Sequence, residues 1–257
     1  MREDIIARLD GVSLTYHEPS RETKAIEGLT LSVKRGEFLS IVGPSGCGKT
    51  SVLKLLTGLC TPSSGSVRVL GKPPAEALPW VGYMLQRDEL LDWRTIEKNV
   101  LLGLEVKREL TPETRQKALE MLEKYGLGEF RRHYPAELSG GMRQKAALIR
   151  TLAFSPELLL LDEPFSALDY QTRLILEDEV REVIKQGGYT AILVTHDISE
   201  AICMSDRVAV FSGRPARVRR EFAIELEGSA LERRRAEGFP KLFDGIWKEL
   251  KADEQGA

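Results

Sequence analysis

The sequence predicts an α/β protein with a mainly parallel sheet, a small antiparallel β subdomain and an inserted helical subdomain. Two continuous apolar segments, residues 158–164 (LLLLDEP) and 191–197 (AILVTHD), are typical of strands buried on both faces of a parallel sheet. Between them, residues 171–186 carry apolar side chains at helical spacing and are followed by two glycines. This order predicts the strand, helix and strand crossover that parallel strands require.

The first third of the chain predicts a strand, a glycine-rich loop and a helix in succession. An apolar stretch at residues 37–42 leads into GPSGCGKT at 43–50, and the leucines that follow recur at helical spacing. Gly65 then indicates a turn, and the alternation of Val67 and Val69 indicates a small antiparallel ribbon beside the main sheet.

Residues 88–155 have a helical pattern and are expected to form a subdomain inserted into the α/β core. Thr111 can cap a helix that Pro112 opens and Gly126 ends. We place the core at residues 1–87 and 156–214, within a single domain that covers residues 1–257.

Beyond Arg214 the pattern changes to clustered charges of both signs, and we expect a solvated surface segment. Residues 239–250 are more ordered in pattern, because apolar side chains there form one stripe of a terminal amphipathic helix. We therefore treat residues 215–257 as a carboxyl-terminal tail whose helix docks on its own domain.

Composition disfavours several classes of protein. The 37 Lys and Arg residues against 39 Asp and Glu give a formal charge of −2, which supplies no broad positive field for nucleic acid. No apolar run approaches the roughly 18 to 20 residues needed to cross a bilayer, and the opening MREDIIARLD lacks a signal-peptide core. Three cysteines without CxxC spacing fit a reducing cytoplasm.

The strongest motif is residues 43–50, which match the phosphate-loop (Walker A) pattern in full between a predicted strand and helix. Glycines let backbone amides point at phosphate oxygens, and the helix N-terminus adds partial positive charge. Lys49 can reach the terminal phosphates, and Thr50 can place its hydroxyl on Mg²⁺. The alternative is a glycine-rich turn without a ligand. The motif predicts a P-loop NTPase core of the RecA-like type that binds a nucleoside triphosphate.

A pair of carboxylates closes the apolar strand at residues 158–162. Asp162 is expected at the carboxyl end of the strand, where ligands bind in parallel sheets, and can hold Mg²⁺ through water. Glu163 can accept a proton from the water that attacks the terminal phosphate, or orient that water. The alternative is a charged transition from strand to loop.

The segment 138–144 (LSGGMRQ) predicts a second helix N-terminus suited to an anion. Ser139 is a suitable N-cap, and the following glycines expose backbone amides. An SGG tripeptide alone is usually a loop. Placed 18 residues before the LLLLDEP strand, counting from Gly140 to Leu158, it closely resembles the signature of the ATP-binding cassette (ABC) family.

This resemblance covers nearly the whole chain and implies further roles. Tyr16 resembles the aromatic residue that stacks on adenine, and its alternative is a strand aromatic facing the core. Gln86 resembles the glutamine that reaches Mg²⁺ and the attacking water, and otherwise would be an exposed loop residue. His196 resembles the histidine that contacts the terminal phosphate, and residues 166–169 resemble a loop that contacts the partner subunit.

The resemblance implies ATP and Mg²⁺ as cofactors. The residues implied to contact ATP are Tyr16, Gly43, Pro44, Ser45, Gly46, Cys47, Gly48, Lys49, Thr50, Ser51, Ser139, Gly140 and Gly141. The residues implied to hold Mg²⁺ are Thr50, Gln86 and Asp162, and the implied catalytic residues are Lys49, Gln86, Glu163 and His196.

The resemblance also implies partners. In the family two subunits meet head to tail around ATP, and here they would act on separate permease subunits at the cytoplasmic face of a membrane, with a solute-binding protein involved indirectly. Residues 92–95 and the terminal helix are similar to the branch that imports nitrate, sulfonates, taurine and related solutes, although Asp92 stands where that branch often has proline.

Two other functions remain open at this point. A soluble cassette ATPase not coupled to transport usually carries a long coiled coil or two cassettes, and this chain has neither feature. A small-molecule kinase would not explain the SGG segment or Glu163 beside Asp162.

For Cys47, the nearby Lys49 and helix N-terminus favour a thiolate, and the alternative is a small residue that fits the turn.

Overall fold

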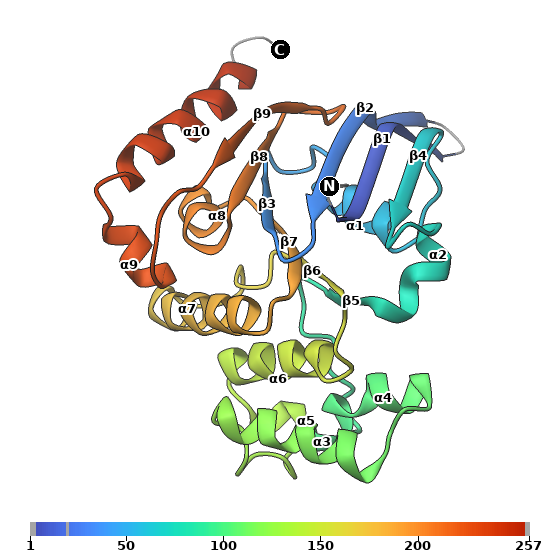
Figure 1. Ribbon diagram of the computed structural model, residues 1–257, viewed down its shortest axis with the longest axis vertical. Coiled ribbons are helices and arrows are strands. Elements are labelled where there is room, and N and C mark those ends of the chain that lie inside the picture. The colour runs from blue at the N-terminus through green and yellow to red at the C-terminus, as the bar shows by residue number, and fades with distance from the viewer. Residues whose placement is uncertain (1–3, 19–20, 255–257) are drawn as a thin grey trace.

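The central element is a six-stranded sheet, seen edge-on through the middle of the molecule in the computed structural model (Figure 1). The structure describes residues 4–18 and 21–254. The strand order is β5-β6-β7-β3-β8-β9. The strands are β3 (Phe38–Val42), β5 (Val81–Met84), β6 (Leu158–Asp162), β7 (Thr190–Thr195), β8 (Arg207–Phe211) and β9 (Val218–Ala223).

In this spatial order, β5, β6, β7, β3 and β8 all pair in parallel with their neighbours among these strands. Every residue of β3, β6 and β7 is buried, as their continuous apolar sequences predict. The helix α7 (Tyr170–Gln186) provides the crossover between β6 and β7. The register pairs Val42 with Thr195 and Asp162 with Val194. The carboxyl ends of β3, β6 and β7 therefore lie at one edge of the sheet, where the candidate site is formed.

A three-stranded antiparallel sheet confirms the predicted β subdomain. Its order is β2 (Arg21–Lys34), β1 (Ile5–Glu18) and β4 (Ser64–Val69), so the predicted ribbon pairs with β1 rather than standing alone. Apolar side chains of this sheet and of the six-stranded sheet enclose α1 (Lys49–Leu56) in one core. This packing places β1 and β2 beside the phosphate loop.

The helical subdomain lies at one end of the molecule, below β5 and β6 in the view of Figure 1. Thr111 caps α5 through the backbone amide of Thr114, and Pro112 opens that helix, as predicted. The larger helices are α3 (Ile96–Val100), α4 (Leu102–Lys107), α5 (Pro112–Lys124) and α6 (Gly140–Leu152). One shorter element of this subdomain is η2 (Pro135–Glu137), whereas α2 (Pro74–Ala77) and η1 (Leu78–Trp80) precede β5, and α2 lies against β4 of the β subdomain.

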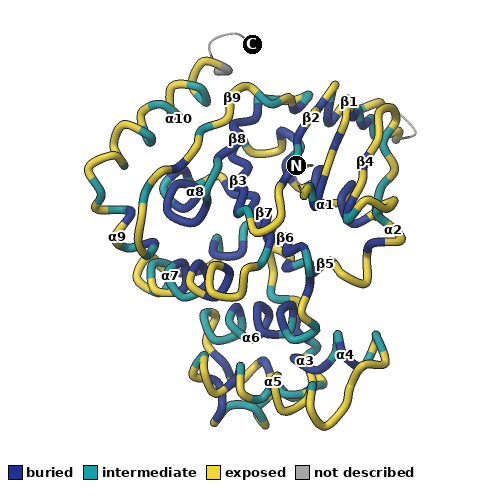
Figure 2. The backbone as a smooth tube through the Cα atoms, in the orientation of Figure 1, coloured by how far each residue is buried: buried dark blue, intermediate teal, exposed yellow. Residues whose placement is uncertain are grey.

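The segment after Arg214 differs from the expectation of a solvated surface segment. Its strand β9 pairs antiparallel with β8 and forms the edge of the main sheet. Most β9 side chains are at least partly exposed, so its sequence is polar and does not predict a strand. Backbone hydrogen bonds to β8 hold the strand in the sheet. The burial colouring of Figure 2 shows this contrast between β9 and the dark central strands.

The terminal helix α10 (Phe239–Glu254) docks on its own domain, as its apolar stripe predicts. Ile246 is fully buried, whereas Trp247 is 45% exposed, so the stripe is not buried along its whole width. Two further helices, α8 (Ile198–Met204) and α9 (Ala230–Arg235), lie beside it. None of the helices in the described part of the chain has the length and apolar character needed to cross a membrane.

Candidate nucleotide-binding site

The phosphate loop lies between β3 and α1, and two of its glycines are required by its shape. Gly46 has φ +72° and Gly48 has φ +127°, values that favour glycine. A Cβ atom on Gly48 would lie 2.7 Å from the carbonyl oxygen of Ala25 on β2. Lys49 is buried, and its Nζ donates hydrogen bonds to the carbonyl oxygens of Gly43 (2.7 Å) and Pro44 (3.0 Å).

A cavity of about 250 Å³ opens over this loop. Tyr16 forms one wall, and its hydroxyl donates to Ser51 Oγ at 3.1 Å. Tyr16 is partly buried and packs against the core, as the alternative interpretation expects, whereas its stacking on adenine stays a prediction. The predicted nucleotide contacts that line the cavity are Tyr16, Ser45, Gly46, Gly48, Lys49, Thr50 and Ser51.

Asp162 lies at the end of β6 between two hydroxyl groups. Thr50 Oγ1 donates to its Oδ1 (3.1 Å), and the Tyr83 hydroxyl donates to its Oδ2 (3.2 Å). Burial raises the pKa of Asp162 above its ordinary value, although both hydroxyls and the nearby Lys49 ammonium oppose that shift. The carboxylate is therefore a desolvated oxygen ligand with its partners already in place.

The oxygen atoms of this cluster fit Mg²⁺, which binds carboxylates, hydroxyls and phosphate oxygens. Within residues 4–18 and 21–254, no three His, Cys, Asp or Glu side chains gather into a cluster able to hold a metal ion. Mg²⁺ commonly takes one or two protein carboxylates and completes its shell with substrate phosphates and water. Thr50 and Asp162 beside the phosphate loop match that arrangement.

Glu163 follows directly and adopts a left-handed backbone conformation, with φ +46°. Such strain in a residue other than glycine persists only where surrounding contacts impose it. Here the Glu163 amide donates to the carbonyl of Val194 (2.8 Å), and Ser166 Oγ donates to the Glu163 carbonyl (3.0 Å). These contacts hold the residue at the edge of the cavity.

Three of the predicted catalytic side chains meet at the Glu163 carboxylate. Its Oε2 accepts a hydrogen bond from Gln86 Nε2 (3.3 Å) and lies 3.1 Å from Nδ1 of His196. Gln86, Glu163 and His196 come from the segments that follow β5, β6 and β7. The fourth predicted residue, Lys49, lines the cavity together with Glu163. Among the hydrogen bonds of the described residues, Gln86 bonds to Glu163, whereas Asp162 bonds to Thr50 and Tyr83.

The loop that carries Gln86 is tied to the helical subdomain. Arg143 of α6 donates to Asp88 Oδ2 (3.0 Å), and Arg150 donates to the carbonyls of Asp88 and Glu89, both at 2.6 Å. Gln144 Nε2 also donates to the carbonyl of Pro164, next to Glu163 (2.6 Å). The helix α6 is therefore bonded to the segments on both sides of the carboxylate cluster.

The signature residues begin α6 as predicted but lie away from the phosphate loop of the same chain. Ser139 caps the helix by accepting from the amide of Met142 (3.3 Å). A Cβ atom on Gly141 would lie 2.7 Å from Thr172, so the close contact of α6 with α7 requires glycine. Ser139 and Gly140 are exposed, and none of the three residues lines the phosphate cavity.

Two site residues escaped the sequence analysis. Tyr83 bonds to Asp162, and Arg214 donates from Nε and Nη2 to the carbonyl of Gly46 at 3.0 and 2.5 Å. Tyr83 could have been suspected from its place on a strand three residues before Gln86. Arg214 carries no sequence signal, because the loop between β8 and β9 brings it to the phosphate loop.

The expectation of a Cys47 thiolate is wrong. Cys47 is 1% exposed, and burial raises the pKa of its thiol even though Lys49 lies nearby. A Cβ atom on Gly43 would lie 3.0 Å from the Cys47 sulfur. Cys47 is therefore a small residue that fits inside the turn.

The fold and these side chains define a P-loop NTPase with a β subdomain, a helical insertion and a second helix N-terminus that begins with Ser139. The family model described as ABC transporter matches residues 26–166, which is more than half of the chain. The chain belongs to the ABC transporter family. It is the ATP-binding subunit of an ABC transporter, and its enzymatic activity is that of an ABC transporter ATPase.

Curated and solved relatives agree with this assignment. The chain is 47% identical over 250 residues to YtlC of Bacillus subtilis, an uncharacterized ABC transporter ATP-binding protein, covering 96% of each. It is 38% identical over 211 residues to the aliphatic sulfonates import ATP-binding protein SsuB of Bacillus licheniformis, covering 82% of each. The dimeric post-hydrolysis structure of the ATP-binding cassette MJ0796 with ADP and Pi covers 86% of this chain at 30% identity, with a TM-score of 0.76. The predicted fold and enzyme class are confirmed.

Proposed function

We propose that two copies of this chain join head to tail and hydrolyse ATP between them. The observation that carries the proposal is the separation of two anion-binding elements within one copy. The phosphate loop lines a cavity, whereas Ser139 and Gly140 are exposed outside that cavity. In a head-to-tail dimer, Ser139 of the partner copy closes the cavity over the terminal phosphate. The solved cassette MJ0796 is a dimer in a post-hydrolysis state with ADP and Pi, which supports dimerisation of this chain.

The reaction is the attack of water on the terminal phosphorus of ATP. Glu163 Oε2 takes the proton of the water, the bond from that phosphorus to the bridging oxygen breaks, and ADP and inorganic phosphate leave. Gln86 and His196 keep the Glu163 carboxylate in place, and Lys49 offsets charge on the leaving phosphates. Thr50 and Asp162 would hold Mg²⁺, which would supply further positive charge to the phosphate oxygens.

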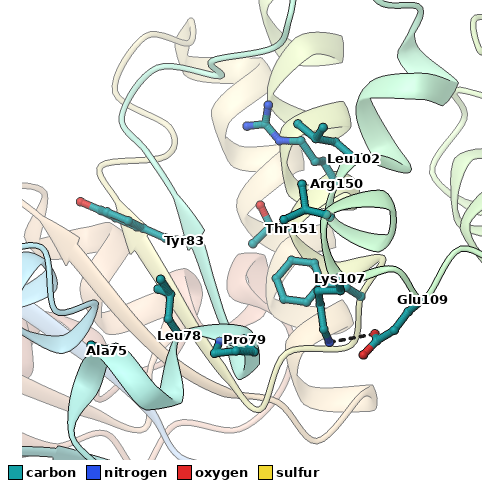
Figure 3. Close-up of a pocket in the computed structure, with 12 residues that line it drawn as sticks. Ala75, Leu78, Pro79, Tyr83, Leu102, Lys107, Glu109, Arg150 and Thr151 are labelled. Atoms are coloured by element: carbon teal, nitrogen blue, oxygen red, sulfur yellow. Dashed lines mark ion pairs between the residues drawn. The ribbon is translucent and has the colours of Figure 1, made fainter.

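We further propose that the permease subunits dock in a groove between the core and the helical subdomain. The groove has a volume of about 680 Å³ and is shown in Figure 3. Leu78 and Pro79 line it from the core, and Val106 and Phe154 line it from the helical subdomain. Val106 is 74% exposed and Leu78 47% exposed in this groove, and exposed apolar side chains gathered in one place and rimmed by polar residues are typical of a protein interaction site.

The groove is chemically suited to an amphipathic segment. Its apolar lining is bordered by Arg150 and by an ion pair between Lys107 and Glu109 at 2.9 Å (Figure 3). Docking there would place the subunit at the cytoplasmic face of a membrane, with a solute-binding protein acting on the other side. Arg150 also binds the carbonyls of Asp88 and Glu89, so a docked segment would adjoin the loop that carries Gln86.

For the transported solute we propose a small compound such as nitrate, a sulfonate or taurine. The likeness to an aliphatic sulfonate import protein over 82% of each chain supports this class. Residues 92–95 and the terminal helix also resemble that branch of importers.

The Glu163→Gln variant tests the dimer. It should hydrolyse no ATP and should form a stable dimer when ATP is added, measured by light scattering after size-exclusion chromatography. Adding Ser139→Arg to this variant should keep it monomeric, because the arginine side chain would block the contact with the partner's phosphate loop. The exposed Glu113→Gln is the control and should retain turnover.

A Glu163→Gln protein that stays monomeric with ATP, or a double variant that still dimerises, would contradict the head-to-tail arrangement. Release of inorganic phosphate without phosphorylation of an acceptor separates this function from that of a small-molecule kinase.

A further inference from the structure

Tyr83 contacts two functional regions at once. Its ring lines the groove between the core and the helical subdomain, and its hydroxyl donates to Asp162 Oδ2 at 3.2 Å. Figure 3 shows the hydroxyl directed away from Leu102 and Lys107 on the other side of the groove. No other residue that lines this groove also has a hydrogen bond to Asp162 among those found in the described part of the chain.

The sheet register places Tyr83 on the same face as Asp162. In the parallel pair of β5 and β6, Tyr83 lies opposite Leu160, and Asp162 is two residues beyond Leu160. Side chains two residues apart on a strand point to the same face of the sheet. Tyr83 therefore reaches diagonally along this face toward the end of β6, where a tyrosine is long enough to contact Asp162 but a smaller side chain is not.

We infer that Tyr83 is a positioning residue that orients the Asp162 carboxylate as a ligand for the divalent cation of the ATP site. This inference rests on the proposed function for the identity of the bound species. Thr50 bonds to Oδ1 and Tyr83 bonds to Oδ2, so the two hydroxyls act on different oxygens of one carboxylate. Together they hold the plane of the carboxylate, which a single hydrogen bond would leave free to rotate.

Burial makes this orientation dependent on Tyr83. Asp162 is 5% exposed, so bulk water has little access to replace a lost donor on Oδ2. A tyrosine hydroxyl ordinarily keeps its proton near neutral pH and is therefore a hydrogen-bond donor. Hydrogen bonds to the ligands of a metal commonly change its affinity by about 10- to 100-fold when they are removed.

The test compares Tyr83→Phe with Tyr189→Phe. The Tyr83→Phe change removes the hydroxyl and keeps the ring that lines the groove. Tyr189 is also partly buried but is not a hydrogen-bond partner of Asp162, which makes it a matched control. Both changes are made in the Glu163→Gln background, so that ATP is not consumed, and Mn²⁺ binding to the ATP complex is titrated by electron paramagnetic resonance.

Tyr83→Phe should weaken Mn²⁺ binding by about tenfold, at the lower end of that range because the tyrosine is an uncharged donor. The affinity for ATP in the absence of divalent cations should stay within about twofold of the parent, since Asp162 does not line the cavity. In the otherwise wild-type protein, the Mg²⁺ concentration for half-maximal ATPase should rise while kcat at saturating Mg²⁺ changes little. Tyr189→Phe should change none of these quantities.

An Mn²⁺ affinity of the Tyr83→Phe variant within twofold of its parent would overturn the inference. If no variant, including the parent, binds Mn²⁺ with ATP, the proposed function fails instead. In that case a crystal structure of Tyr83→Phe still decides the inference: a carboxylate that has rotated away from Thr50 supports it, and one with unchanged orientation refutes it.

Discussion

Replacing Gly48 by alanine should disrupt the phosphate loop more than any exposed glycine substitution. Gly48 has φ +127°, and its added Cβ would lie 2.7 Å from the carbonyl oxygen of Ala25 and 3.3 Å from Ala216 Cβ. The carbonyl of Ala25 cannot move freely, because it accepts a hydrogen bond from the amide of Ala216 at 2.9 Å. The methyl group must therefore displace the loop, β2 or both.

The magnitude follows from two separate costs. The backbone conformation costs an alanine about 1 to 3 kcal/mol. Relief of the contact with Ala25 adds about 1 to 3 kcal/mol, the usual cost of overpacking. The sum is about 2 to 6 kcal/mol, a large share of the roughly 5 to 15 kcal/mol that stabilises a typical domain. Displacement of the loop amides should also weaken ATP binding by at least about tenfold, which corresponds to about 1.4 kcal/mol.

Gly126→Ala provides the matched control. Gly126 also has a positive φ of +72°, but nothing lies within 4 Å of its added Cβ. Its substitution should cost only about 1 to 2 kcal/mol, the penalty of a left-handed conformation, and leave ATP binding unchanged. Urea unfolding gives the free energies of unfolding, and fluorescence titration gives the affinity for ATP. If Gly48→Ala costs no more than Gly126→Ala and binds ATP normally, the argument from close approach is wrong.

Two further predictions concern Arg214 and the three cysteines. Arg214→Ala should weaken ATP binding by about three- to tenfold, because the Gly46 carbonyl loses two charged donors whose effect is reduced by exposure to water; titration of ATP against wild-type protein checks this. An unchanged affinity would exclude Arg214 from the site. Burial raises the pKa of all three cysteine thiols, to about 12 for Cys203, but Cys60 is partly exposed whereas Cys47 and Cys203 are buried. Iodoacetamide at pH 8 should therefore modify Cys60 first, and mass spectrometry that finds Cys47 modified first would contradict this order.

Strands could be predicted where the pattern of apolar and polar residues reflects how far the strand is buried on each face. The strands β3, β6 and β7 are buried on both faces, so their sequences are continuously apolar. The edge strand β9 has one neighbour and mostly exposed side chains, so its sequence looks like a surface segment. Its backbone hydrogen bonds to β8 do not depend on the type of side chain, so the sequence pattern does not reveal them.

Site residues could be predicted where all the residues of a motif lie in one short continuous segment. Residues 43–50 contain the glycines and lysine of the phosphate loop in one continuous segment, and Ser139 caps the helix that it precedes. The thiolate expectation for Cys47 failed because the charge of Lys49 is visible in the sequence whereas the burial of the sulfur is not.

Three chemical features could be predicted because each lies in one short continuous segment: a phosphate loop, an Asp–Glu pair at the end of a strand, and a second helix N-terminus. Which side chains hold those groups could be found only from contacts between distant parts of the chain. Tyr83 reaches Asp162 across 79 positions of the chain, and Arg214 reaches Gly46 across 168. Such contacts depend on strand register and loop paths, and these result from the packing of the whole chain rather than from any local segment.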